Sequence, residues 1–388
     1  MKRVLCVYAT RQIDSNLFMS STIFRGLQEA GYETYMVFAG TNKVITDFKL
    51  KYSHYFKEVL YITITESYLK RTCDKLPVTK LGYSFYRHFI ADGFTHLNLR
   101  GIKKSLSTYA IDCILSFIPP ILSGKLAIDI KKSLGLNTVP LIQYWTDPLS
   151  LGRYDHVSQL SKTRIIHKYQ ESRLLKHSDR VIFCYPLLCE MEQKLHPQYA
   201  EKMSWSDISY MTRAENKKTV NNEKPLIGFF GAYQKKVRNI IPLIQTINEL
   251  PQYNFIIRGD GDLDYDTTSI VNLNIKPNRL PLSEIEELES QCDILLSIGG
   301  RSGLTHPAGK TFYYASYNKP IIHIGDGINA SYFMEYLRGF GDRFIHCYNN
   351  KESIEKAIKM AVELLPYFKL TIPERMNAGN IARKIIEE

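Results

Sequence analysis

Short, continuous apolar runs alternate along the chain with longer segments of helical period. In the first half, the runs that predict strands lie at 4–9, 34–38, 59–63, 112–117, 139–144 and 180–184. Segments that predict helices lie between them, at 17–30, 83–108, 123–134 and 161–177. Strands that alternate with helices are typical of βα units around a parallel sheet. Each run is apolar at successive positions, as expected when helices cover both faces of the sheet.

The pattern lapses over residues 204–224, which are polar, rich in Asn and Lys, and predicted to contain neither a strand nor a long helix. A second βα series follows, with strands predicted at 226–230, 255–258, 271–275, 294–297, 320–324 and 343–348. Its helices are predicted up to 250 and at 282–291, 308–317 and 351–365.

The two series predict an α/β protein with two Rossmann-like, doubly wound domains that face a cleft. We place the N-terminal domain at 1–205, a linker at 206–224 and the C-terminal domain at 225–372. A C-terminal amphipathic helix, 373–388, is free to pack back on the N-terminal domain. Ligands bind beyond the carboxyl ends of the strands in such sheets, so the cleft is where we expect chemistry.

The composition argues against a membrane-spanning protein, a secreted protein and a protein built on a metal or disulfide framework. None of the apolar runs in the 388 residues approaches the roughly 20 residues of a membrane-spanning helix. The apolar stretch after Met1-Lys2-Arg3 is too short for a signal peptide, so the sequence predicts a cytoplasmic protein. Its seven cysteines form no CxxC pair, which favours reduced, buried thiols over a metal or disulfide framework.

The positive charge is concentrated in the first half of the chain. The net charge is +11, and residues 1–200 hold 27 Lys and Arg against 16 Asp and Glu. Residues 201–388 hold 23 of each sign. This asymmetry predicts an anionic partner for the N-terminal half, with a merely basic, solvated face as the alternative. No helix-turn-helix, zinc-finger or RNP signature accompanies the charge, so nucleic acid is not the expected partner.

Two strand-to-helix turns in the second half carry the features of an anion site. A predicted strand ends at Gly299-Gly300, where backbone amides can approach a ligand closely. Lys310 follows in the first turn of the next helix, and a cation there is unfavourable unless an anion lies opposite. The other turn follows Gly231 and contains three cations: Lys235, Lys236 and Arg238. Because both turns open on one edge of the sheet, we expect them to converge on a phosphate group.

The acidic stretch at 256–266 (IIRGDGDLDYD) has the alternating aspartates of a calcium loop. Tyr265 stands where that loop requires Gly, and Val271 stands where it requires Glu. We therefore interpret the stretch as an acidic turn and expect no metal, with a DxD site for a nucleotide as the alternative.

Several further segments are informative through their order along the chain. They are Glu171 to Ile182 (ESRLLKHSDRVI), Leu226 to Gly231 with Arg238-Asn239, Arg258 to Gly261 (RGDG), Cys292 to Ser297 (CDILLS) and Pro307 to Ile322 (PAGKTFYYASYNKPII). In this order they resemble the GT-B glycosyltransferases, and specifically the family-4-like sugar transferases of bacterial surface polysaccharide synthesis. The resemblance implies a nucleotide-sugar donor held by the C-terminal domain and a glycan or lipid-linked acceptor held by the N-terminal domain.

The resemblance also implies roles for individual residues. Lys310 and Arg238, with Lys235 and Lys236, would bind the donor diphosphate and stabilise its departure, so that no metal or other cofactor is required. Tyr313 falls where the family carries the glutamate that holds the ribose. The other residues expected at the donor are Gly231, Gly299, Gly300, Arg301, Ser302, His306, Tyr314, Arg279 and Leu280.

On the acceptor side, Asp147 follows a buried strand in Trp145-Thr146-Asp147-Pro148. A carboxylate there would orient or deprotonate an acceptor hydroxyl, and capping of the next turn is the alternative role. The basic N-terminal half would dock on the inner face of an anionic membrane.

The sequence thus predicts a metal-independent, hexosyltransferase-type enzyme, with retention of configuration implied by the family. Two alternatives are a non-catalytic partner subunit with the same frame, favoured by Tyr313 in place of glutamate, and a sugar-nucleotide 2-epimerase. An epimerase needs catalytic carboxylates and histidines in the cleft, and the sequence shows no such cluster.

Overall fold

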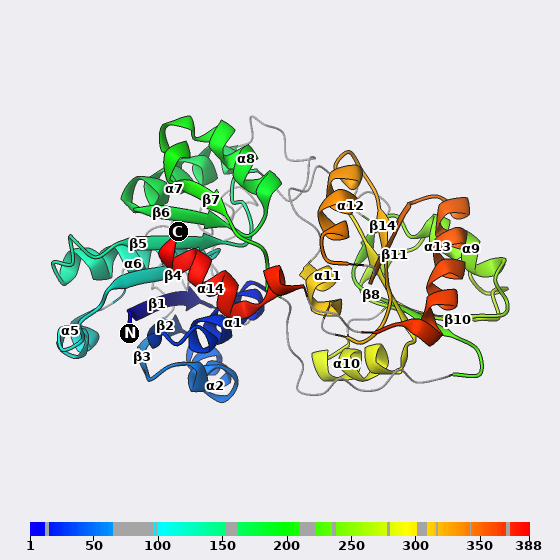
Figure 1. Ribbon diagram of the computed structural model, residues 1–388, viewed down its shortest axis with the longest axis horizontal. Coiled ribbons are helices and arrows are strands. Elements are labelled where there is room, and N and C mark those ends of the chain that lie inside the picture. Colours follow the sequence, from blue (N-terminus) through cyan, green and yellow to red (C-terminus); the bar gives the residue numbers. More distant parts are fainter. Residues whose placement is uncertain are drawn as a thin grey trace, which may run out of the picture. The chain divides into compact units, whose positions relative to one another are not determined.

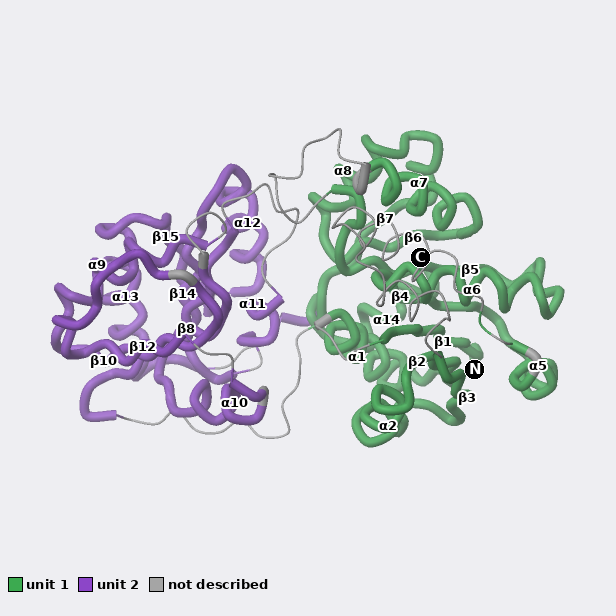
Figure 2. Tube along the Cα trace, turned by 180° about the vertical axis from the view of Figure 1, so that it is seen from behind, with its two compact units in different colours: residues 1–152, 156–209, 375–388 green, residues 153–155, 210–374 purple. Residues whose placement is uncertain are grey.

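The structure of the protein is a computed structural model, which describes residues 1–11, 15–64, 97, 99–151, 162–209, 222–234, 238–277, 280–300, 309–315, 317–341, 343–369 and 373–388. The chain divides into two compact units (Figure 2). Unit 1 contains the described residues up to Ser209 together with Arg375–Glu388. Unit 2 contains the described residues from 222 to Glu374.

Unit 1 is built on a seven-stranded parallel sheet with the order β3-β2-β1-β4-β5-β6-β7 (Figure 1). Its strands are β1 Arg3–Thr10, β2 Glu33–Gly40, β3 Glu58–Thr63, β4 Cys113–Ile118, β5 Leu141–Trp145, β6 Arg180–Phe183 and β7 Met203–Trp205. Its α-helices are α1 Ser15–Glu29, α2 Asn42–Lys51, α5 Arg100–Leu106, α6 Ile121–Ser133, α7 Lys162–His177, α8 Pro186–Leu195 and α14 Ala378–Glu387. Short 3-10 helices lie at Ser53–Tyr55, Pro197–Lys202 and Glu374–Met376. The central strands are buried at nearly every position, which explains their continuous apolar runs.

One expectation for this region is wrong. The sequence predicts no strand in 204–224, but Ser204 and Trp205 belong to β7, the last strand of the sheet. The strand has three residues and pairs with β6 through its backbone, Val181 opposite Met203 and Phe183 opposite Trp205. Main-chain pairing of so short a segment leaves no side-chain period to detect.

The C-terminal helix α14 packs against α1 of unit 1. It buries Ile381, Ile385 and Ile386 on one face. Just before it, Arg375 donates two hydrogen bonds to Asp207, from Nε to Oδ2 at 3.0 Å and from Nη2 to Oδ1 at 2.7 Å. The two helices approach so closely at Gly26 that a Cβ there would lie 2.2 Å from the carbonyl oxygen of Ala378.

We expect Gly26→Ala to destabilise unit 1 by about 1–3 kcal/mol, because backbone atoms cannot yield to the added methyl group without moving the helix. Gly101→Ala is the matched control, since Gly101 lies in helix α5 and a Cβ there meets no atom within 4 Å. Urea unfolding measures both free energies. Equal stabilities of the two variants would contradict the close packing of α14 on α1.

Unit 2 is built on a six-stranded parallel sheet with the order β12-β10-β8-β13-β14-β15. Its strands are β8 Leu226–Phe230, β10 Asn254–Arg258, β12 Leu273–Lys276, β13 Ile294–Ile298, β14 Ile321–Gly325 and β15 Phe344–Tyr348. The pair β9 Tyr233–Gln234 and β11 Gly261–Asp262 forms a separate two-stranded sheet. The helices are α9 Ile241–Asn248, α10 Leu282–Gln291, α11 Gly309–Tyr314, α12 Ala330–Arg338 and α13 Lys351–Leu364, with a 3-10 turn at Leu365–Tyr367.

Two histidines face each other across β14 and β15 in this sheet. His323 and His346 are register partners with ring centroids 6.0 Å apart, and His323 is fully buried. Their ring nitrogens have no hydrogen-bond partner among the described residues. Burial, and then the neighbouring His346, lowers the pKa of His323 to about 3. Burial, and then Arg338, lowers the pKa of His346 to about 4. Both rings are therefore neutral inside the folded unit at neutral pH.

We expect unit 2 to lose stability as the pH falls below about 6.5, the pKa of an unfolded histidine. In that range the unfolded chain binds protons that the folded rings do not. At pH 5 the effect is about 2 kcal/mol for the fully buried His323, and it is smaller for His346, which is partly exposed to solvent. Urea unfolding at pH 7.5 and pH 5 measures it, with His323→Leu/His346→Leu expected to lose much of the pH dependence. The exposed His54 provides the control, His54→Leu, and an unchanged pH dependence in the double variant would contradict the assignment.

The described helices include none that is long and apolar enough to cross a lipid bilayer.

Candidate functional site

The carboxyl ends of β8 and β13 lie side by side in unit 2, because the two strands are parallel neighbours. Gly231 directly follows β8, and its N–H donates to the carbonyl of Arg258 at 2.9 Å. At the end of β10, Gly259 has a φ of 153°, and a Cβ there would lie 2.1 Å from the carbonyl oxygen of Gly231. Glycine is therefore required for the close approach of these two turns.

Arg238 links the ends of β8 and β13. Its Nε donates to the carbonyl of Ile298 at 3.1 Å, and its Nη1 donates to the carbonyl of Ala232 at 3.4 Å. Ile298 is the last residue of β13, and Gly299-Gly300 follow it in buried positions. The structure thus brings Arg238 and the Gly299-Gly300 turn together at one edge of the sheet.

Lys310, in the first turn of α11, lies near the end of β8. Its Nζ is 6.0 Å from the ring centroid of Phe230, the last residue of that strand, and 5.9 Å from that of Tyr314. The Nζ is also 3.7 Å from Oε1 of Glu289, whose side chain is fully buried. The anion expected opposite this lysine is therefore present in the protein itself. The Lys310 side chain as a whole remains 41% exposed.

Helix α10 supplies two carboxylates to the α11 segment. Glu286 Oε1 accepts a hydrogen bond from the Tyr313 hydroxyl at 2.9 Å, and Glu289 Oε2 accepts one from the Tyr317 hydroxyl at 2.9 Å. Tyr313, which the resemblance in sequence places where the glycosyltransferases carry a glutamate, is 5% exposed. Its hydroxyl is therefore occupied by a hydrogen bond within unit 2. Tyr314 is fully buried, and its hydroxyl donates to the carbonyl of Phe230 at 3.4 Å.

Two residues that hold the α11 segment in place were not predicted from the sequence: Glu286 and Glu289. Their spacing of three residues puts both on one face of a helix. Exposed helices often carry two acidic residues three positions apart. The spacing alone therefore does not indicate that these two carboxylates face inward.

A second missed group lies at the ends of β14 and β15. The Asn349 side-chain amide donates to the carbonyl of Asn239 at 2.8 Å and to Oδ2 of Asp326 at 2.8 Å. Gly299 donates its N–H to the carbonyl of Ile324 at 2.9 Å. These contacts tie the turn that carries Arg238 to the neighbouring strands, and they place a carboxylate, that of Asp326, beyond the end of β14.

The remaining donor-side predictions fall in two groups. Leu280 is partly buried between β12 and α10. The others lie outside the described residues, and the structure says nothing of them: Lys235, Lys236, Arg279, Arg301, Ser302 and His306.

In unit 1, Asp147 lies two residues beyond the end of β5 and is 6% exposed. The segment after it is held by Glu171 of α7, whose Oε1 accepts hydrogen bonds from the N–H groups of Leu149 at 2.8 Å and Ser150 at 2.7 Å. Burial, and then the Asp147 carboxylate, raises the pKa of the Cys184 thiol. Glu171 is thus a positioning residue for the segment that carries Asp147.

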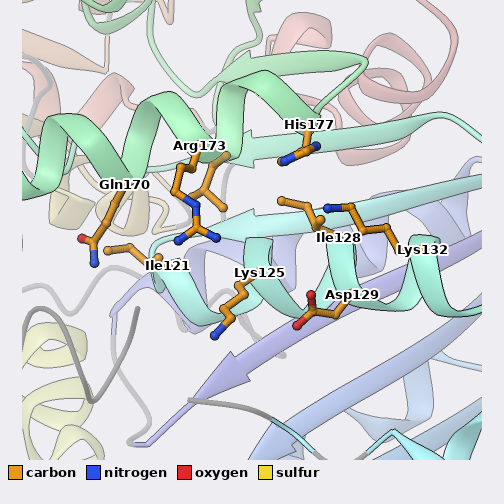
Figure 3. A pocket seen from close by; sticks show the side chains of 9 residues that line it. Ile121, Lys125, Ile128, Asp129, Lys132, Gln170, Arg173 and His177 are labelled. Atoms are coloured by element: carbon orange, nitrogen blue, oxygen red, sulfur yellow. The ribbon is translucent and has the colours of Figure 1, made fainter. Parts of the chain in front are cut away.

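A basic pocket of about 70 Å³ lies between α6 and α7 of unit 1 (Figure 3). We call it the α6–α7 pocket; it is lined by Ile121, Lys125, Ile128, Asp129, Lys132, Gln170, Arg173, Leu174 and His177. Figure 3 shows the Arg173 guanidinium extending from α7 toward α6 and Lys125. Partial burial, and then Lys132, lowers the pKa of His177. Partial burial and Arg173 likewise lower the pKa of Lys125 against the opposing effect of Asp129. Crowded cations of this kind favour an anionic ligand.

The comparisons with known proteins bear on the fold. No protein-family model matches the sequence, and no curated protein does. The UDP-GlcNAc 2-epimerase from Methanocaldococcus jannaschii has a similar structure, with a TM-score of 0.52 and 12% identity over 100% of this chain and 98% of its own. The catalytic domain of starch synthase IV from Arabidopsis thaliana, bound to ADP and acarbose, has a TM-score of 0.57 and 9% identity over 100% of this chain and 95% of its own.

The fold is GT-B. The expectation of two Rossmann-like α/β domains is confirmed by the two parallel sheets and by these two structures. Likeness at such low identity extends to the fold alone.

Proposed function

We propose that this protein is a glycosyltransferase that moves a sugar from a nucleotide-sugar donor to a glycan or lipid-linked acceptor. The observation that carries the proposal is the carboxyl edge of β8 and β13, where Arg238 joins two glycine turns and Lys310 lies beside Phe230 at the end of β8. This is the edge at which sheets of this type bind ligands. Cations fixed there suit the diphosphate of a nucleotide sugar.

In the proposed reaction, the bond between the anomeric carbon of the sugar and the diphosphate oxygen breaks, and an acceptor oxygen forms the new bond to that carbon. The electron pair leaves with the diphosphate, whose growing negative charge Lys310 and Arg238 stabilise. The acceptor hydroxyl loses its proton to a base, for which Asp147 is the candidate. Because the two cations supply the charge stabilisation, the reaction requires no metal.

Both cations are held by unit 2 before any donor binds. Arg238 donates to two backbone carbonyls, and Lys310 is paired with the buried Glu289. Charged groups that are already in position lose little reorganisation energy as charge develops, which is how such sites accelerate reactions.

The acceptor is proposed to be anionic or attached to an anionic membrane surface. The net positive charge of the first 200 residues and the α6–α7 pocket of unit 1 support this part of the proposal. A surface-polysaccharide pathway and a peripheral position on the inner face of the cell membrane fit such an acceptor.

We expect Lys310→Ala and Arg238→Ala each to lower turnover by about 10²–10³-fold, the usual loss for one group that stabilises developing charge. Calorimetric titration with UDP-, GDP- and CMP-sugars identifies the donor, and release of the free nucleotide measures turnover. Lys356→Ala is the control, because Lys356 is exposed on α13 in the same unit. Unchanged turnover and nucleotide affinity in the Lys310→Ala/Arg238→Ala double variant would refute the proposal.

The same titration distinguishes the two alternatives. A transferase binds one nucleotide without added metal and releases it when an acceptor is present. An epimerase converts the sugar while the sugar remains attached to the nucleotide, and a non-catalytic partner subunit binds no nucleotide.

A separate prediction concerns the membrane. Each cation near an anionic surface contributes about 1 kcal/mol, so Lys132→Ala/Arg173→Ala is expected to weaken binding to phosphatidylglycerol vesicles by about 30-fold. Lys356→Ala/Lys359→Ala removes the same charge from α13 of unit 2 and is expected to have little effect. Vesicle sedimentation measures both, and equal losses would show that net charge, rather than the α6–α7 pocket, decides binding.

A further inference from the structure

Three ligand-type side chains meet in the interior of unit 1, away from the proposed donor site. Glu171 comes from α7, Glu192 from α8, and His196 directly follows α8. One potential ligand atom from each lies within 4.8 Å of the other two, and all three residues are buried. Within the described part of the chain, this is the one cluster of such residues with the geometry to hold a metal ion.

Glu192 is the residue of this cluster whose carboxylate is left without hydrogen bonds in the part of the chain that the structure describes. Its side chain is 1% exposed, and neither carboxylate oxygen has a hydrogen-bond partner among the described residues. Oε2 of Glu192 points toward the cluster and lies 4.0 Å from Nε2 of His196. A buried carboxylate without a partner is very unfavourable, and few native structures retain one without a compensating group.

Protonation of Glu192 would remove the charge of the carboxylate but would leave its two oxygens without hydrogen-bond partners from the residues that the structure describes. Burial, and then the neighbouring Glu171, raises the pKa of Glu192 well above its usual value. A protonated carboxyl group, however, contains an O–H donor and a carbonyl acceptor. Neither oxygen has a hydrogen-bond partner among the described residues.

One of two ligand separations matches that around a small divalent cation, and the other exceeds it by roughly half an ångström, which a small side-chain movement would close. His196 Nε2 lies 3.3 Å from Glu171 Oε2 and 4.0 Å from Glu192 Oε2. Tetrahedral Zn²⁺ with bonds of about 2.0–2.2 Å separates its ligands by about 3.3–3.6 Å. Two carboxylates and a neutral imidazole also balance the two charges of the ion, so the filled site would be neutral in the protein interior.

We propose that Glu171, Glu192 and His196 bind one structural Zn²⁺ inside unit 1. The ion would join α7 to α8. Because Glu171 also accepts the N–H groups of Leu149 and Ser150, it would fix the segment that follows Asp147. This ion takes no part in the proposed sugar transfer and does not depend on it.

The test is the metal content and thermal stability of the full-length protein, expressed in zinc-supplemented medium and passed through gel filtration. We expect about one Zn²⁺ per chain by elemental analysis. Removal by a strong chelator should lower the melting temperature of unit 1 by roughly 5–10 °C, and added Zn²⁺ should restore it. Glu192→Gln keeps the size of the side chain and should abolish binding, whereas Glu190→Gln, exposed on the same helix, should retain it.

Wild-type protein that contains no Zn²⁺ and shows no thermal shift when Zn²⁺ is added would overturn the proposal. Equal Zn²⁺ content in wild type and Glu192→Gln would overturn it as well, because the ion would then lie elsewhere. If Glu192→Gln does not fold, Co²⁺ added to the chelator-treated wild type provides the second readout. A tetrahedral site with these ligands should give visible absorption bands that Zn²⁺ abolishes, and the absence of such bands would contradict the assignment.

Discussion

The ion pair between Lys310 and Glu289 is the contact on which the proposed donor site depends. Glu289 is fully buried, and a buried carboxylate requires a counter-charge or hydrogen-bond donors. Tyr317 supplies one donor and Lys310 supplies the charge. The lysine is therefore held beside Phe230 at the end of β8, while its side chain remains partly exposed. The interior of unit 2 thus fixes the position of a surface cation.

The backbone of the same sheet fixes the second cation. Arg238 donates to carbonyls at the ends of β8 and β13, and Asn349 joins its turn to Asp326 beyond β14. Parallel strands bring these turns to one edge, and glycine at 259 permits their close approach. The chemistry of the site thus follows from sheet topology together with a few buried polar contacts.

The fold was predictable from the sequence because continuous apolar runs and helical segments report directly on a parallel sheet. The pairing of β7 was not, since a three-residue edge strand leaves no period. Lys310 and Arg238 were predicted as site residues from their places in strand-to-helix turns. Glu289, the partner of Lys310, escaped because it lies on another helix, and the partners of Arg238 are backbone carbonyls. Only tertiary packing brings either cation to its partners.

Unit 1 shows the same dependence on buried carboxylates. The sequence singled out Glu171 as part of a motif, and the structure gives the physical reason, which is that its oxygens hold the chain beyond Asp147. Glu192 and His196 carried no sequence signal, because their contact with Glu171 joins separate helices. In both units, interior acids position segments that reach the carboxyl ends of the strands.

Hydrogen–deuterium exchange with and without a nucleoside diphosphate tests the central claim most directly, because it locates binding without altering the protein. We predict slower exchange at the backbone amides of 230–234, 238–241 and 298–300 when the nucleotide is added, with β2 and β3 of unit 1 unchanged. Protection confined to unit 1, or no protection at saturating nucleotide, would contradict a diphosphate site at this edge of unit 2.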